Sequence, residues 1–119
     1  MRIIDRKRFL ACPPSTIYMK GVPFAFEGLC VKGDSLANDW IYLPLDTWQN
    51  KGDDYADIGF HAIESGESIP MNSDGWQRDG CFDEREMFVI YEEADLRALI
   101  SHAEAAFVKE IVLKEIGDD

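Results

Sequence analysis

The chain has 119 residues, of which 46% are hydrophobic and 29% are charged, and its formal net charge at pH 7 is −11. This length corresponds to one domain, here predicted to be a single acidic domain over residues 1–119, and the composition excludes wholesale disorder. No run of about 18 apolar residues occurs and charges interrupt the apolar stretch at the N-terminus, which excludes a membrane-spanning helix and a signal peptide.

The first third of the chain predicts one short helix and the start of a sheet. Asp5 is placed to cap a helix over residues 5–12, and the two prolines that follow end it because proline lacks a backbone donor. Residues 15–19 are rich in β-branched and aromatic side chains, which predicts a strand, followed by a turn at residues 20–21. The apolar stretch 22–26 contains a proline and is therefore expected at a sheet edge.

Two further strands are predicted, the first from side chains that alternate with a period of two and the second from a strongly apolar run. They cover residues 29–32 and 39–45, and the Gly-Asp-Ser sequence at 33–35 predicts the turn between them. Short strands joined by tight turns are typical of an antiparallel meander.

Residues 46–81 form a loop-rich region in this interpretation. Turn-forming residues dominate it and no apolar period lasts, so we expect a long loop attached to the body by its scattered aromatic side chains. Loops of this length are uncommon in compact domains and are often functional.

The last third predicts a turn, a strand and a helix. The turn covers residues 82–86 and the strand residues 87–91. Asp95 is expected to cap a helix that continues to about residue 116. Its inward face shows helical spacing: Leu96, Leu99, Ile100, Ala103 and Phe107. The predicted fold is α+β, with a small, mainly antiparallel sheet of three to five strands and this helix packed on one face.

Charge is unevenly distributed along the chain. Residues 1–33 carry six basic and two acidic side chains, whereas residues 34–119 carry six basic and 21 acidic ones. The electrostatic field of this acidic part of the chain repels nucleic acids and anionic membranes and favours a basic protein partner. The cysteines, Cys12, Cys30 and Cys81, are odd in number and lack a CxxC spacing, which indicates reduced thiols and a cytoplasmic location.

Motifs for catalysis or for a resident metal are missing. Residues 75–86 match a calcium loop only in part, because Gly75 and Gln77 stand where carboxylates are required. His61 and His102 belong to no zinc or nucleophile motif. The clustered carboxylates leave open one alternative, a divalent-metal-dependent hydrolase. Its candidate ligands are Asp53, Asp54, Asp57, Asp74, Asp79, Asp83, Glu84 and Glu86.

Aromatic residues beside acidic ones form the predicted binding site. Trp48 and Trp76 lie in or next to the acidic loop region, and exposed aromatic side chains rimmed by charge anchor many protein interfaces. We predict that a protein partner with a basic surface is bound by Trp48, Trp76, Asp79, Asp83 and Glu84. We predict no catalytic residue, no metal ligand and no cofactor.

Four features of the chain bear on its family: the stretch 78–83 (Arg-Asp-Gly-Cys-Phe-Asp), the strand 87–91, the capped helix that follows, and the Phe-Leu pair ahead of the two prolines. In these features the chain resembles small uncharacterised acidic proteins of phages and prophages. The resemblance covers most of the chain and implies a small intracellular protein, made in a bacterial host, that binds and blocks a host protein. The predicted function is therefore non-enzymatic protein binding, as in a phage-type inhibitor of a basic host protein. A structural or assembly protein that dimerises through the C-terminal helix is a second hypothesis.

Overall fold

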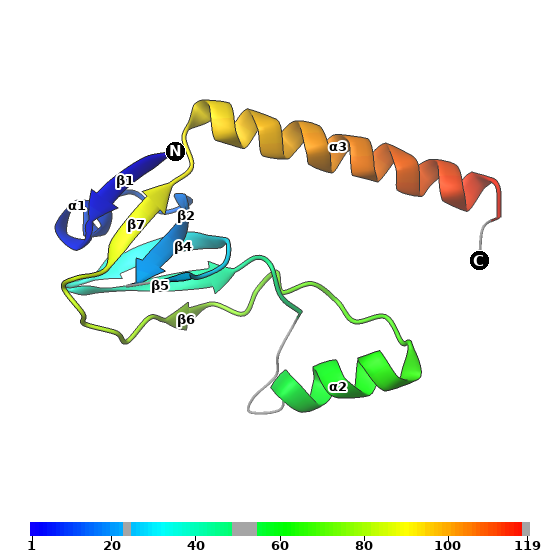
Figure 1. The fold of residues 1–119 in the computed structure, drawn as a ribbon, viewed down its shortest axis with the longest axis horizontal. Coiled ribbons are helices and arrows are strands. Elements are labelled where there is room, and N and C mark those ends of the chain that lie inside the picture. The colour runs from blue at the N-terminus through cyan, green and yellow to red at the C-terminus, as the bar shows by residue number, and fades with distance from the viewer. Residues whose placement is uncertain (23–24, 49–54, 118–119) are drawn as a thin grey trace. The chain divides into compact units, whose positions relative to one another are not determined.

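The computed structural model describes residues 1–22, 25–48 and 55–117 (Figure 1). The chain divides into two compact units. One unit is the body, Ile3–Ile90, which contains nearly all of the sheet. The other joins Met1–Arg2 to the C-terminal segment from Tyr91 onward.

The sheet has more strands than the sequence predicts. The strands are β1 (Arg2–Asp5), β2 (Ile17–Val22), β3 (Ala25–Phe26), β4 (Cys30–Leu36), β5 (Asp39–Pro44), β6 (Gln77–Arg78) and β7 (Met87–Ile90). Six follow the order β1-β7-β2-β4-β5-β6, and β3 pairs with β2 as a seventh. The antiparallel α+β prediction is confirmed. The prediction of three to five strands is wrong, because strands of two to four residues carry too little alternation to be recognised.

Two predicted turns lie inside strands. Lys20 and Gly21 continue β2, where they pair with Phe88 and Met87 of β7. The Gly-Asp-Ser sequence at 33–35 belongs to β4, whose register against β5 shifts between Lys32 and Ser35. A bulge of this kind accommodates turn-forming residues within a strand. The chain reverses later, between β4 and β5.

The N-terminal helix forms as predicted but is shorter. Helix α1 covers Arg6–Leu10, and the Asp5 carboxylate accepts a hydrogen bond from the backbone nitrogen of Arg8 at 2.9 Å. This contact satisfies one of the free donors at the helix start. Phe9, on the inner side of α1, is completely buried.

The expectation of a long loop over residues 46–81 is wrong for Tyr55–Ser65, which form helix α2. Residues 49–54 lie outside the described part of the chain. Gly59 is buried in α2, and a Cβ atom added there would lie 2.4 Å from the indole of Trp48. A glycine that looks like a helix breaker in the sequence therefore gives the indole room to pack on the helix.

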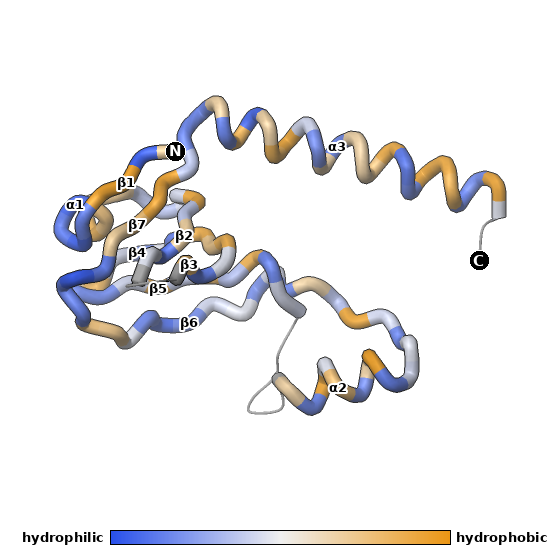
Figure 2. Tube along the Cα trace, viewed as in Figure 1, coloured by the Kyte–Doolittle hydropathy of each residue, from blue (hydrophilic) through white to orange (hydrophobic). Residues whose placement is uncertain are grey.

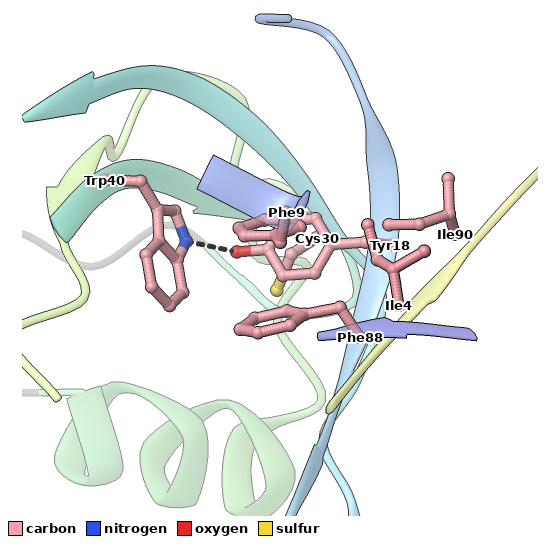
Figure 3. Close-up of a cluster of buried hydrophobic side chains, with 7 residues drawn as sticks. All are labelled: Ile4, Phe9, Tyr18, Cys30, Trp40, Phe88 and Ile90. Carbon is pink, nitrogen blue, oxygen red and sulfur yellow. Dashed lines mark hydrogen bonds between the residues drawn. The ribbon is translucent and has the colours of Figure 1, made fainter. Parts of the chain in front are cut away.

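Aromatic rings form the centre of the body. The ring centroids of Phe9 and Phe88 are 4.1 Å apart in a stacked arrangement, and the Trp40 ring meets both edge-on. The indole nitrogen of Trp40 donates a hydrogen bond of 2.8 Å to the Tyr18 hydroxyl (Figure 3). Ile4, Cys30 and Ile90 complete this cluster. Rings from α1, β2, β5 and β7 thus share one core.

Helix α3 covers Glu93–Glu115 and begins two residues before the predicted cap. The Asp95 carboxylate accepts from the backbone nitrogen of Glu92 at 2.8 Å, so Asp95 stabilises the helix start from inside the first turn. None of the residues of α3 is buried. Its expected packing on the sheet stays a prediction. No helix in the described residues is long and apolar enough to cross a membrane.

Replacing Tyr18 by Phe is expected to lower the free energy of unfolding by about 1–3 kcal/mol, because the buried indole N–H of Trp40 loses its acceptor. Urea unfolding followed by fluorescence measures the change. Tyr42→Phe is the matched control, since Tyr42 is only partly buried beside the same core. Equal losses in the two variants would contradict the assigned role of the hydrogen bond.

Candidate functional site

A group of charged side chains is buried beside the aromatic core. Lys20 on β2 is 8% exposed, Arg6 on α1 is 7% exposed and Glu86, directly before β7, is 1% exposed. Charged groups are rarely buried unless they are paired, because leaving water costs several kcal/mol per ion. The partners of each group therefore define the site.

The Lys20 ammonium lies among three carboxylates. Its nitrogen is 3.0 Å from Oδ1 of Asp79, 3.6 Å from Oε1 of Glu86 and 3.8 Å from Oε2 of Glu27. Burial opposes the charged ammonium, but the hydrogen bond to Asp79 and the charges of Asp79, Glu86 and Glu27 raise the pKa of Lys20. Lys20 therefore stays charged and holds the acids together.

The Arg6 guanidinium occupies the other side of Glu86. It lies 3.3 Å from Oε2 of Glu86 and donates a second hydrogen bond to the backbone oxygen of Asn38. The guanidinium carbon also lies 4.8 Å from the centre of the Trp40 ring and 5.6 Å from that of Phe82. Arg6 thus joins the ionic group to the aromatic core through cation–π contact.

Cys81 adds a sulfur to this group. The ligand atoms of Asp79, Cys81 and Glu86 all lie within 4.8 Å of one another. The backbone nitrogen of Cys81 donates to Oδ2 of Asp79 at 3.0 Å. Among the described residues, this is the one set of three or more metal-binding side chains so close together. The larger carboxylate convergence that the hydrolase hypothesis requires is therefore not observed in the described part of the chain.

Asp39 fixes the loop that carries these residues. Its carboxylate is fully buried and accepts hydrogen bonds from Nε of Arg78 at 2.9 Å and from the backbone nitrogen of Gly80 at 3.1 Å. Gly80 has a φ of 69°, a conformation that favours glycine. Burial disfavours the carboxylate, yet hydrogen bonds from the backbone of Trp40, from Arg78 and from Gly80 hold the pKa of Asp39 below its usual value.

A surface pocket of about 500 Å³ lies next to the ionic group. Its lining comes from the end of β1, α1, the β4–β5 turn and the segment before β7: Asp5, Arg6, Lys7, Leu10, Asn38, Phe82 and Glu84. Glu84, a predicted partner-binding residue, is exposed at this pocket. Neighbouring Asp83 pairs with the Arg85 side chain at 2.9 Å, and hydrogen bonds from Arg85 lower the pKa of Asp83 to about 2.

The predicted partner-binding residues occupy different settings. Trp48 is half-buried against Gly59 of α2, whereas Trp76 is 47% exposed and lies against Gly33 of β4. The Asp79 side chain is only 7% exposed and is held by Lys20, so it is a structural ion pair and not a free surface acid. Trp76, Asp83 and Glu84 are exposed or partly exposed. Partner binding by the five residues stays a prediction.

Sequence reasoning missed the basic half of the site. The sequence places Arg6 and Lys20 in a basic N-terminal segment, but both side chains are internal and paired. Lys32 is also buried, at 1% exposure, and its ammonium donates to Gly33 and Ser35. A signal for Lys20 was available in the sequence, since it interrupts an otherwise apolar strand. Arg6 lies in a helix among other basic residues, and the sequence contains no sign that it is buried.

Comparisons with protein-family models, with curated proteins and with solved structures find no match to this chain.

Replacing Asp39 by Asn is expected to lower the free energy of unfolding by about 1–3 kcal/mol at neutral pH, because charged hydrogen bonds to Arg78 and Gly80 are weakened. The folded-state pKa of Asp39 is lowered, so its contribution is complete above the ordinary carboxyl pKa and is lost as the pH falls. The difference from wild type should therefore shrink below about pH 4. Denaturant unfolding across this range measures it, with exposed Asp34→Asn as control. A difference that grows on acidification would contradict the assignment.

Proposed function

We propose that this protein is a non-enzymatic binding protein that acts through protein–protein contact, with helix α3 as its principal contact element. One observation carries the proposal. The helix extends over 23 residues without a buried residue. It exposes large hydrophobic side chains along its length: Leu99, Ile100, Phe107, Val108, Ile111, Val112 and Ile116.

Apolar side chains on a protein-binding helix gain stability from burial in a partner. Figure 2 shows hydrophobic residues recurring along α3 between hydrophilic ones. Helices in proteins owe most of their stability to packing of an apolar face and not to intrinsic propensity. Burial of each large side chain contributes on the order of 1.5–3 kcal/mol, which favours insertion of the helix into an apolar groove.

Charge supports a basic partner. The net charge is −11, and burial leaves this acidic excess on the surface almost unchanged, because buried Arg6, Lys20 and Lys32 are accompanied by buried Asp39 and Glu86. Complementary charge raises the association rate and makes it sensitive to salt. Trp76, Asp83 and Glu84 are proposed as additional contacts with this partner. Inhibition of a basic host protein, in the manner of a phage-type inhibitor, is the more specific form of the proposal.

The proposal is tested by capture of partners from bacterial lysate with the tagged full chain. We expect a basic protein that is retained at low salt and released at high salt. Phe107→Glu should reduce its retention at least about tenfold, because a charge at a contact residue disrupts apolar burial. His102→Glu adds the same charge at another exposed position of α3 and is the matched control.

Two outcomes would contradict the proposal. One is the absence of a salt-sensitive basic protein. The other is equal retention by wild type, Phe107→Glu and His102→Glu at equal helicity, measured by circular dichroism. A separate variant, Trp76→Ala combined with Glu84→Gln, tests the additional contacts and should weaken retention by a smaller factor.

Self-association through α3 is the second candidate function. It is favoured by the spread of exposed apolar residues around the last turns of the helix, where Phe107, Val112 and Ile116 lie on more than one face. Sedimentation at tens of micromolar is expected to show a dimer for wild type and a monomer for Ile111→Glu. A wild-type monomer over this concentration range would exclude this candidate and leave the heterologous partner.

A further inference from the structure

We infer that Asp79, Cys81 and Glu86 form a binding site for one divalent transition-metal ion of the zinc class. Their ligand atoms lie within 4.8 Å of one another. Zinc–oxygen and zinc–sulfur bonds of about 2.0–2.3 Å place the ligands of a tetrahedral site roughly 3.4–3.8 Å apart. The three donors therefore have to approach one another by on the order of 1 Å to surround one ion.

Glu86 supplies an independent indication of a ligand. Its side chain is 1% exposed, and Oε1 has no hydrogen-bond partner among the described residues. Oε2 contacts Arg6, whereas Oε1 is the atom directed toward Lys20 and its partner Asp79. A buried carboxylate oxygen without a hydrogen bond costs on the order of 1–3 kcal/mol or more, so this atom is available to a bound cation.

Lys20 is the competitor for this position. Its ammonium lies 3.6 Å from Oε1 of Glu86, within ion-pair range but beyond hydrogen-bond range. Glu27, whose side chain is 58% exposed, lies 3.8 Å from the same nitrogen on the solvent side. When a metal ion enters, the ammonium can turn toward Glu27 and remain paired. Binding therefore requires an ion that interacts with the donors more strongly than a single positive charge does.

The donor set selects the class of ion. A thiolate with two carboxylates suits zinc and neighbouring transition metals, whereas calcium and magnesium prefer oxygen ligands alone. Coordination releases the thiol proton of Cys81 to solvent, and the exposed position of Cys81 provides a path of entry. Three protein ligands leave one tetrahedral position for water. The hydrogen bonds of Asp39 to Arg78 and Gly80 hold the loop in place before the ion arrives.

The test uses the full chain after treatment with a chelator. Zinc titration by calorimetry is expected to give one ion per chain, and zinc should raise the unfolding temperature. Cobalt should produce a thiolate-to-metal absorption band. Cys81→Ser should abolish the band and weaken zinc binding at least about tenfold, since a soft ligand is lost. Cys12→Ser, which removes a thiol elsewhere, should retain both.

A variant of the competitor gives an independent second readout, taken after circular dichroism has shown that the variant is folded. Lys20→Met removes the ammonium, so zinc should bind at least about tenfold more tightly and raise the unfolding temperature more than in wild type. The proposal is overturned by the absence of stoichiometric zinc binding, by a cobalt band that survives Cys81→Ser, or by preference for calcium or magnesium. Zinc affinity unchanged in Lys20→Met would also overturn it.

Discussion

The pairing of Lys20 with Asp79 and Glu86 is the constraint on which the body depends. An ammonium beside an aromatic core is stable only if acidic groups reach it, and those groups come from a segment some sixty residues further along the chain. The loop between β6 and β7 must therefore lie against β2. The charged group determines the course of the chain as much as the apolar contacts do.

The Arg6 side chain contacts both the aromatic core and the ionic group. Its guanidinium contacts Trp40 and Glu86 at the same time, and Trp40 in turn holds the Tyr18 hydroxyl. A rotation of the indole would disturb a hydrogen bond and a cation–π contact together. The packing of Trp40 and the pairing of the charged groups therefore constrain one another.

The sequence predicts those elements whose signal is local. Asp5 marked the first helix, and the apolar runs around Trp40 and Phe88 marked two central strands, all of which the structure confirms. The sequence does not predict the elements that depend on contacts between residues far apart in the chain. Helix α2 depends on the fit between Gly59 and Trp48, and a two-residue strand such as β6 exists because β5 lies beside it. Neither relationship leaves a periodic pattern.

The candidate site, too, is predicted in part from the sequence and depends in part on contacts between distant residues. The sequence shows Asp79 and Glu86 as two of many carboxylates. Their role in the site depends on ion pairs with Lys20 and Arg6, and no sequence spacing connects these residues. Burial also reduces the apparent positive charge of the N-terminal segment, because three of its six basic side chains are internal.

The contact between Trp48 and Gly59 gives the protein a built-in optical reporter. The indole rests on the backbone of α2 with no intervening side chain, so separation of the helix from this position would expose the ring to water and shift its emission to longer wavelength. Trp40 is fully enclosed and would keep a blue-shifted emission until the core itself opens. Local detachment of α2 and global unfolding therefore change the emission of different tryptophans, Trp48 and Trp40, while exposed Trp76 contributes a long-wavelength background to both.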